Sequence, residues 1–272
     1  MTAIQRWGEQ LEAWAIPAEI LAAAQESPYG FPAELFRTRG ARRDEPEAPT
    51  PTTRRALERL PEGGRVLDVG CGGGATSLPL AERAGDLVGV DAQEDMLEGF
   101  VVNASAVGIR AEAVQGRWPD VAGAIEPVDV AIAGHVLYNV ADLGPFVREL
   151  AATARRRVVF ELTERHPLHW MNDLWLRFHG LERPSGPVPD DALDALAEMD
   201  LDARIERWQA APRLGGFARR ADALALARRR LCLPASRDDE LAGALGDRLA
   251  ERGGLWSVGP ASQALATLWF DR

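Results

Sequence analysis

The sequence predicts an α/β protein built on a doubly wound, seven-stranded and mostly parallel sheet, with helical additions at both ends that form a lid. Two patterns lead to this prediction. Short apolar runs alternate with helical stretches through the middle of the chain, and the first run leads into glycines. Parallel strands need crossover connections, so this alternation is typical of a sheet covered on both faces. The 272 residues, 46% of them hydrophobic, suffice to bury a sizeable core.

Strands are expected where valine-rich or other apolar runs lie between turn signals. These runs cover residues 65–69, 87–90, 111–114, 128–132, 157–162, 201–208 and 263–270. Helical patterns lie before and between the first five, at residues 53–60, 77–84, 94–106 and 143–154. Pro61 ends the first helix, and Pro79 fits the first turn of the second, where its missing N–H costs nothing.

Both ends of the chain add helical sequence to this core. Trp7, Leu11 and Trp14 recur at helical spacing, and Pro17 ends their helix. A proline-rich and charged linker is expected over residues 41–52. Further helices are expected over residues 167–178, from a cap at Asp190 to 199, and over 217–231 and 238–250. We therefore expect a helical cap and linker at 1–52, the α/β core at 53–165, and a completing part with an aromatic helix at 166–272.

Charge and composition exclude several classes of function. The net charge is −10, so phosphate backbones and anionic membranes repel the chain, and nucleic acid is an unlikely partner. All 31 basic residues are arginine, which excludes a lysine Schiff base and the lysine of a phosphate-binding P-loop. Two cysteines in so long a chain fit a reducing cytoplasm. No membrane span and no signal peptide are expected, since Glu9, Glu12 and Glu19 interrupt the N-terminus.

The most informative segment is Val66–Gly74, where a buried strand runs into four glycines. Gly70, Gly72 and Ala75 satisfy the dinucleotide fingerprint, so an NAD-dependent oxidoreductase is one alternative. Asp68 argues against it, because a carboxylate at the strand end suits a cationic group better than a pyrophosphate. Asp68 acting only as a helix cap is the other interpretation of this residue.

This segment resembles the first motif of class I S-adenosylmethionine (SAM)-dependent methyltransferases, and the resemblance extends over about residues 60–165. It implies a Rossmann-like, SAM-binding core and an antiparallel seventh strand. It also implies that the glycine loop wraps the methionine part of the cofactor, that Asp68 holds its ammonium group, and that Asp91 binds both ribose hydroxyls. Asp91 as a simple turn residue is the alternative. The cofactor-binding residues expected here are Asp68, Gly70, Cys71, Gly72, Gly74, Asp91, Ala92, Gln93 and Met96.

The third region departs from that family. Many members have an acid after strand three that meets the adenine amino group, but this chain has Gly116, Arg117 and Trp118. Backbone groups are expected to hold adenine instead, with Arg117 or Trp118 stacking on the ring. Trp118 as a core residue is the equally open alternative.

The ends of strands four and five should face the reacting centre. Gly134 and His135 are expected beside the cofactor sulfur, and His135 is the candidate general base, with simple packing as the alternative. Tyr138, Glu161, Glu164, Trp170 and Trp175 are assigned to the substrate pocket, although the tryptophans could only attach helices to the sheet. Glu161 and Glu164 with His166 and His169 suggest a metal, but Pro167 interrupts them, so no metal is expected.

Together these features predict a SAM-dependent methyltransferase (EC 2.1.1.-) that produces S-adenosylhomocysteine (SAH) and modifies a small-molecule acceptor. An RNA or protein acceptor is an alternative, because arginines outnumber acids between Arg213 and Arg252. A non-catalytic SAM-binding regulator is another. The sequence fixes neither the acceptor nor the oligomeric state.

Overall fold

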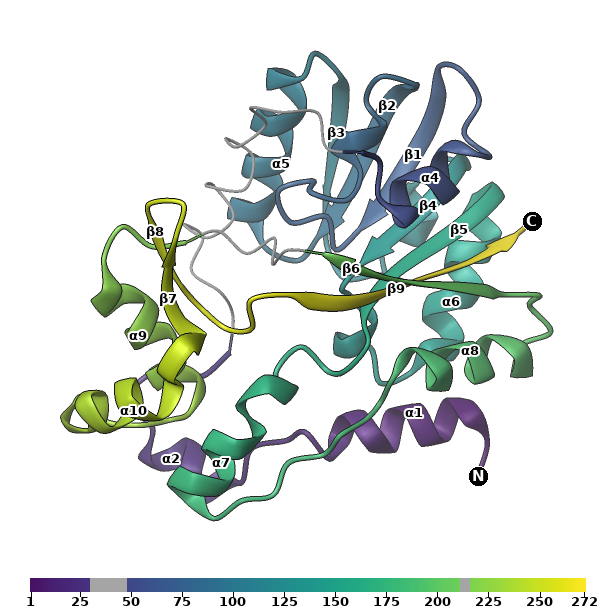
Figure 1. Cartoon of the computed structure of the whole chain (residues 1–272). Helices are drawn as coiled ribbons and strands as arrows, with labels where there is room; N and C mark the ends of the chain where they lie inside the picture. Colours follow the sequence, from purple (N-terminus) through teal and green to yellow (C-terminus); the bar gives the residue numbers. More distant parts are fainter. Residues whose placement is uncertain (30–47, 211–215) are drawn as a thin grey trace.

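A seven-stranded mixed sheet forms the centre of the computed structural model, which describes residues 1–29, 48–210 and 216–272 (Figure 1). The strand order is β3-β2-β1-β4-β5-β9-β6. The first five strands run parallel, and β9 is antiparallel to both β5 and β6. The predicted fold class and the antiparallel last strand are confirmed. The strands are β1 (Gly64–Val69), β2 (Ala84–Asp91), β3 (Arg110–Gln115), β4 (Val128–Gly134), β5 (Ala154–Thr163), β6 (Arg204–Ala210) and β9 (Gln263–Asp271).

Helices cover both faces of the sheet because neighbouring residues of its central strands are buried on opposite sides. Val66 packs with helices α4 (Pro51–Leu57) and α5 (Glu94–Ala106) on one face. The next residue, Leu67, packs with α1 (Ala3–Glu12), α6 (Leu143–Thr153) and α8 (Pro189–Glu198) on the other. Because both faces of the sheet are covered, nearly every residue of a central strand such as β4 is buried.

The order of the sheet places the glycine loop at its switch point. Strand β1 pairs with β2 on one side and β4 on the other, so the connections leave in opposite directions from this pair. Ligands of open parallel sheets bind beyond the carboxyl ends of the strands at such a point. The ends of β1 and β4 carry Gly70 and His135, which the fold therefore brings together.

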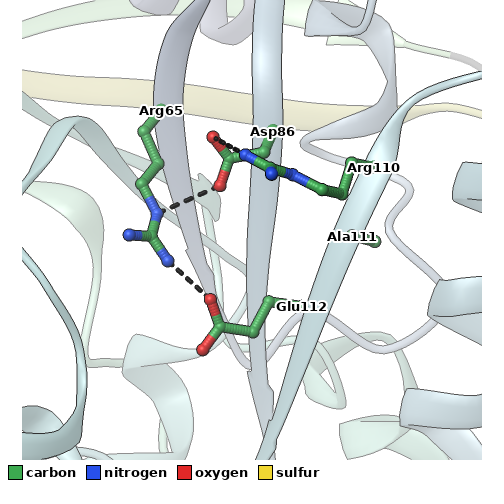
Figure 2. Close-up of a pocket in the computed structure, with 5 residues that line it drawn as sticks. All are labelled: Arg65, Asp86, Arg110, Ala111 and Glu112. Atoms are coloured by element: carbon green, nitrogen blue, oxygen red, sulfur yellow. Dashed lines mark hydrogen bonds and ion pairs between the residues drawn. The ribbon is translucent and has the colours of Figure 1, made fainter.

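The opposite ends of the strands carry a polar network (Figure 2). Arg65 on β1 pairs with Asp86 on β2 at 3.1 Å and with Glu112 on β3 at 2.5 Å, and Arg110 contacts Asp86 at 3.4 Å. The small cavity between them is lined by these charges and Ala111. Because charges of opposite sign face one another across three strands, these ion pairs help to hold the edge of the sheet.

A second apolar cluster lies beside the sheet and is made by the C-terminal part of the chain (Figure 1). It contains Trp175, Leu224, Leu231 and Leu241, and α2 (Ala18–Ala23) packs against it. Its other elements are α7 (Asn172–His179), α9 (Arg220–Arg230), α10 (Asp238–Leu245) and the antiparallel pair β7 (Leu249–Arg252) and β8 (Leu255–Val258).

Several expected elements differ in the structure. The helix predicted over residues 77–84 is wrong: only a short 3₁₀ turn forms at Leu78–Leu80, and β2 already begins at Ala84. The helix predicted over 238–250 ends at Leu245, and the β7–β8 hairpin follows. Helix α8 starts at Pro189, and the carboxylate of Asp191, rather than Asp190, accepts the N–H of Val188 at 2.9 Å.

The division at 1–52, 53–165 and 166–272 stays a prediction. Residues 41–47 of the predicted linker, and Arg213, lie outside the described residues. No helix in the described ranges has the length and apolar character to cross a bilayer.

Candidate functional site

The loop after β1 is shaped by three glycines with left-handed backbone angles. The φ angles of Gly70, Gly72 and Gly74 are 68°, 49° and 83°, values that other residues adopt at a cost. A Cβ at Gly70 would collide with the side chain of Val136, which follows β4. A Cβ at Gly72 would meet nothing within 4 Å, so this part of the loop presents bare backbone to open space. Such a loop lets a ligand approach the main chain closely.

Asp68 is buried under this loop, with 1% of its surface exposed. The hydroxyl of Ser77 donates to its carboxylate at 2.5 Å. Burial, together with the charges of Asp91 and Glu161, raises the pKa of Asp68 to about 7. A cationic group placed here would favour its ionised form, as expected for a residue that holds an ammonium group.

Asp91 ends β2 and is held by the backbone. One carboxylate oxygen accepts the N–H of Gly72 at 3.0 Å, and the other accepts the N–H of Gln93 at 3.0 Å. A carboxylate offers about four acceptor positions, so two remain for the hydroxyls of a diol. The residue expected to bind ribose is therefore fixed at the rim of the glycine loop by the loop itself.

The other residues expected near the cofactor differ in exposure. Ala92 and Gln93 are exposed, whereas Met96 is 6% exposed. Cys71 is also buried, and a Cβ at Gly89 would touch its sulfur. Burial raises the pKa of the Cys71 thiol, so this cysteine acts as a small packed residue.

The region after β3 resolves one open alternative. Trp118 packs against the core beside the sheet, and its indole N–H donates to the carbonyl of Phe146 on α6 at 3.0 Å. This contact favours packing over adenine stacking. Gly116 is half-buried and Arg117 is exposed, so the Arg117 guanidinium remains the side chain from this loop that can reach a ring.

His135 and Glu161 come together at the ends of β4 and β5. The Nε2 atom of His135 lies 3.0 Å from Oε1 of Glu161, and the backbone N–H of His135 donates to the carbonyl of Glu161 at 2.7 Å. Glu161 is fully buried, whereas 31% of the His135 side chain is exposed. Gly134 is packed so tightly on Thr76 that a Cβ there would collide with it.

Thr52 is a site residue that sequence reasoning missed. It lies on α4, and its hydroxyl donates to Oε2 of Glu161 at 2.6 Å. The hydroxyl of Thr267 lies 2.8 Å from that of Thr52, and the indole N–H of Trp208 donates to Thr267 at 3.1 Å. No local pattern signals these three residues, because three distant segments bring them together.

The remaining residues assigned to the substrate pocket have other partners. Tyr138 is buried, stacks on Trp7 with ring centroids 5.8 Å apart, and donates to the carbonyl of Thr163 at 2.6 Å. Trp175 is buried inside the second apolar cluster, and Trp170 packs against its edge. These contacts are those of packing residues, and Tyr138 and Trp175 are 6% and 3% exposed.

The four residues that suggested a metal site do not gather in the structure, and each has a different partner. Glu161 faces His135, and Glu164 pairs with Arg207 at 3.0 Å. The ring of His166 stacks on Trp14 at 3.8 Å, while His169 contacts Arg165. Burial lowers the pKa of His166 to about 3, which keeps it neutral. Within the described part of the chain, no three metal-ligating side chains gather.

The residues present fit SAM. The open backbone at Gly72 suits the aminoacyl tail, buried Asp68 suits its ammonium group, and the anchored carboxylate of Asp91 suits the ribose diol. A pyrophosphate at the glycine loop would meet Asp68 as a like charge, which disfavours the dinucleotide alternative, whereas Asp91 would suit the ribose of either cofactor.

Sequence comparisons agree with this geometry. A family model described as "Methyltransferase domain" matches residues 66–157. The "Ubiquinone biosynthesis O-methyltransferase" of Azorhizobium caulinodans is 42% identical over 94 residues, which are 35% of this chain and 37% of that protein. The protein of that name from Sinorhizobium medicae is 33% identical over 105 residues, or 39% and 41% of the two chains. The match thus spans well under half the length of these curated relatives.

Solved structures share the fold. A putative methyltransferase from Bacillus halodurans has a TM-score of 0.52 at 14% identity, covering 81% of this chain and 98% of that one. A SAM-dependent methyltransferase from Geobacter sulfurreducens, in complex with SAH, has a TM-score of 0.51 at 17% identity, covering 89% and 99%. The strand order of the sheet and the family match together show that residues 66–157 of this chain carry a methyltransferase domain.

Proposed function

We propose that this protein transfers a methyl group from SAM to a hydroxyl oxygen of a small organic molecule. The choice of SAM as the methyl donor, which we call the donor half of the proposal, rests on the position of Asp91. Its two carboxylate oxygens accept the backbone N–H groups of Gly72 and Gln93 at the rim of an open glycine loop. The curated relatives, which are named as O-methyltransferases, support the hydroxyl acceptor.

Charge supports the choice of donor. SAM supplies a methyl group already activated by a positively charged sulfur. Asp68, Asp91 and Glu161 lie close enough for the last two to raise the pKa of the first. This negative cluster would attract the cationic donor more strongly than neutral SAH and so favour exchange of product for donor.

A small acceptor fits the surroundings better than a macromolecule. The net charge of −10 disfavours a nucleic acid. Much of the arginine-rich C-terminal sequence is engaged internally: Arg228 pairs with Asp238 at 2.9 Å, and Arg230 donates to the carbonyl of Pro28 at 2.9 Å. Beside the end of β5, Trp14 stacks on neutral His166, and this aromatic pair is our candidate for an apolar wall of the acceptor pocket.

The donor half is tested by calorimetric titration of the full chain with SAH and, separately, with NADH. We expect SAH to bind near 1 μM, about −8 kcal/mol, and NADH not to bind. Asp91→Asn should weaken SAH binding at least tenfold, because a neutral amide accepts fewer hydroxyl hydrogen bonds. Glu98→Gln on α5, an exposed position, is the matched control and should bind as the wild type does. Preference for NADH would contradict the proposal.

The acceptor half is tested with methyl-labelled SAM and three pools: a panel of phenols and catechols, total RNA, and a protein lysate. Label in the phenol or catechol fraction supports the proposal. Label in RNA or protein alone would contradict the small acceptor. SAH binding with no transfer to any pool would favour a non-catalytic SAM-binding protein.

A further inference from the structure

We infer that Thr52, Glu161 and His135 form a directed series of polar contacts that makes Nδ1 of His135 the base for the acceptor hydroxyl. The inference rests on the proposed function and adds to it the atom that takes the proton and the two residues that position it. His135 would touch the acceptor, so it is the catalytic residue. Glu161 and Thr52 act through it and are positioning residues.

The backbone at His135 is held in an uncommon conformation. Its φ is 61°, in the left-handed region, which residues other than glycine adopt only at a cost in strain. Its N–H is tied to the carbonyl of Glu161, and its ring to the carboxylate of the same residue. One residue on β5 therefore sets both the main-chain and the side-chain direction of His135, and strain at a functional residue is often retained in this way.

The direction of the hydrogen bonds defines the charge on Glu161. An indole N–H can only donate, so Trp208 donates to the hydroxyl of Thr267. The hydroxyl of Thr52 donates to Glu161, so the hydrogen between the two threonines comes from Thr267. Every bond in the series points toward Glu161, which is the arrangement that stabilises a carboxylate.

A carboxylate on Glu161 selects the tautomer of His135. Oε1 of Glu161 lies 3.0 Å from Nε2, so a carboxylate there favours the tautomer with its proton on Nε2, which leaves the lone pair on Nδ1. Nδ1 has no hydrogen-bond partner among the described residues, and the ring is partly exposed. The buried carboxylate would then stabilise the imidazolium that forms when Nδ1 takes a proton.

His135 also lies where the reaction would occur. Val136 packs on Gly70 so closely that a Cβ there would collide with it. The segment with His135 thus lies against the loop that we assign to the methionine part of SAM. In the proposed step the acceptor O–H bond breaks and its proton goes to Nδ1. The oxygen electron pair forms the bond to the methyl carbon, and the electron pair of the broken C–S bond stays on the sulfur of SAH.

The first test needs no acceptor. Long-range ¹⁵N–¹H spectra of the imidazoles in the ¹⁵N-labelled full chain report which ring nitrogen carries the proton, and His135→Asn assigns the signal. Asparagine tolerates left-handed backbone angles, so this variant should fold. We expect a protonated Nε2 and a bare Nδ1 in the wild type, and a mixture of tautomers in Glu161→Gln. A protonated Nδ1 in the wild type, or an unchanged spectrum in Glu161→Gln, would overturn the inference.

The second test measures methyl transfer to phenols that range from acidic nitrophenols to unsubstituted phenol and catechol. His135→Asn should lower kcat about 10²–10³-fold for the least acidic members and less than about tenfold for those already ionised, since these need no base. An equal loss across the series would overturn the role as base. Absence of transfer to every phenol in a protein that binds SAH would overturn the hydroxyl acceptor.

Thr52→Val removes the hydroxyl donor and keeps the shape of the side chain. We expect kcat to fall about tenfold for the unsubstituted phenols, with the KM for SAM within about twofold of the wild type. Thr53→Val is the matched control, because Thr53 is also buried on α4 but its hydroxyl contacts Thr50. Equal losses in both variants would show a structural role only. Calorimetry with SAH on the wild type separates failure of the proposed function from failure of this inference, because the imidazole spectra are recorded without SAM.

Discussion

Single residues of the site combine burial with charge. Asp68 is 1% exposed and carries a carboxyl whose pKa burial raises to about 7, while Asp91 and Glu161 add further negative charge nearby. A folded chain without a cationic ligand is destabilised by such an arrangement when all three are ionised. In the proposed function, this loss of stability would accompany affinity for a cationic ligand.

Asp68→Asn should separate these two effects. An acid with a folded pKa near 7 and an unfolded pKa near 3.8 loses stability as the pH rises through that interval. The variant lacks this loss, so at pH 8 it should be more stable than the wild type by on the order of 3 kcal/mol, and by less at pH 5. Urea denaturation at both pH values measures this difference.

The same variant should bind SAH at least tenfold more weakly, because the ammonium group loses its counter-charge. Equal stability changes at pH 5 and pH 8 would show that the Asp68 carboxyl does not titrate in this range. Unchanged SAH affinity would remove Asp68 from the cofactor site.

Gly70→Ala should disrupt the loop through a collision as well as through its backbone angle. The new Cβ meets Val136, so we expect a loss of about 2–3 kcal/mol in the free energy of unfolding and loss of SAH binding. Gly63→Ala is the matched control, since its φ is 70° but nothing lies within 4 Å. It should cost about 1 kcal/mol and leave SAH affinity unchanged. Urea denaturation and calorimetry compare the two, and equal effects would contradict the role of the Val136 contact.

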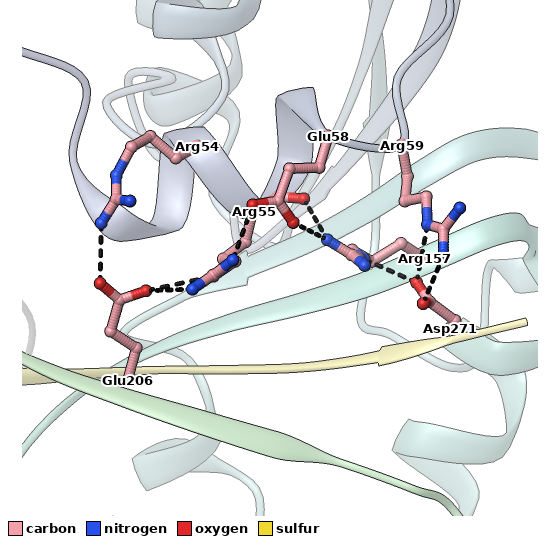
Figure 3. A network of polar contacts seen from close by, with 7 residues as sticks. All are labelled: Arg54, Arg55, Glu58, Arg59, Arg157, Glu206 and Asp271. Atoms are coloured by element: carbon pink, nitrogen blue, oxygen red, sulfur yellow. Dashed lines mark hydrogen bonds and ion pairs between the residues drawn. The ribbon is translucent and has the colours of Figure 1, made fainter.

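At the scale of secondary-structure elements, polar contacts join helix α4 to β5, β9 and β6, the last three strands in the order of the sheet (Figure 3). Arg54 and Arg55 bind Glu206 on β6 at 2.7 and 2.8 Å. Arg157 on β5 binds Glu58 just after the helix at 2.6 Å and Asp271 on β9 at 2.7 Å. These contacts hold a helix of only seven residues in one register, and that register places Thr52 against Glu161.

Arg157→Met tests the most buried member of this network. The Arg157 side chain is 4% exposed and donates to Glu58, to Asp271 and to the carbonyl of Arg55, so its removal breaks three contacts at once and should cost about 2 kcal/mol. Arg59→Met is the control, because Arg59 also binds Asp271 but is 52% exposed, and it should cost less than about 1 kcal/mol. Thermal unfolding by circular dichroism measures both. Similar costs would show that burial of Arg157 adds nothing.

Acid should weaken the same network in the wild type. The hydrogen bond from Arg157, together with that from Arg59, lowers the pKa of Asp271 to about 2. A lowered folded pKa stabilises the chain above the unfolded value near 4 and loses that contribution as the pH falls toward 2. Asp271→Asn should therefore flatten the stability profile between pH 4 and pH 2, as followed by urea denaturation. An unchanged profile would contradict the assignment.

At the scale of the whole molecule, the apolar interior falls into separate clusters. Two of them cover the faces of the sheet, and the third joins α7, α9, α10 and the β7–β8 hairpin. Neighbouring strands pair along their length in the sheet. The C-terminal cluster, called the second apolar cluster above, is instead built from α7, α9, α10, the β7–β8 hairpin and α2. We expect this C-terminal unit to open locally without unfolding of the sheet.

Leu231→Ala and Leu150→Ala test this expectation as a matched pair, because both side chains are fully buried in different clusters. Each should cost about 2–5 kcal/mol at its site. Hydrogen exchange should accelerate in α7, α9 and α10 for Leu231→Ala, with β1, β4 and β5 unaffected. Leu150→Ala should instead accelerate exchange in the sheet. Global acceleration in both variants would show a single cooperative unit.

Local sequence determined the core of the α/β domain and its donor site. Apolar runs of four to six residues, turn glycines and helical spacing are encoded within short windows, so the seven strands of the sheet, helix α5, Asp68 and Asp91 were all predictable. The failed helix over residues 77–84 shows the limit of this approach. There the chain makes only a 3₁₀ turn around Pro79 and then joins β2, because pairing with β1 from Gly64 onward outweighs a weak helical preference.

Only the tertiary structure decided what surrounds the reacting centre. Thr52 is more than a hundred residues away from both Glu161 and Thr267 along the chain. No spacing rule links a helix before β1 to the last strand. The same holds for Trp118 and Tyr138, whose polar atoms are satisfied by distant carbonyls. The residues that we propose to bind the cofactor lie in short segments at the ends of β1 and β2, which local sequence patterns predict. The positioning of His135 depends on long-range hydrogen bonds that exist only once the sheet is complete.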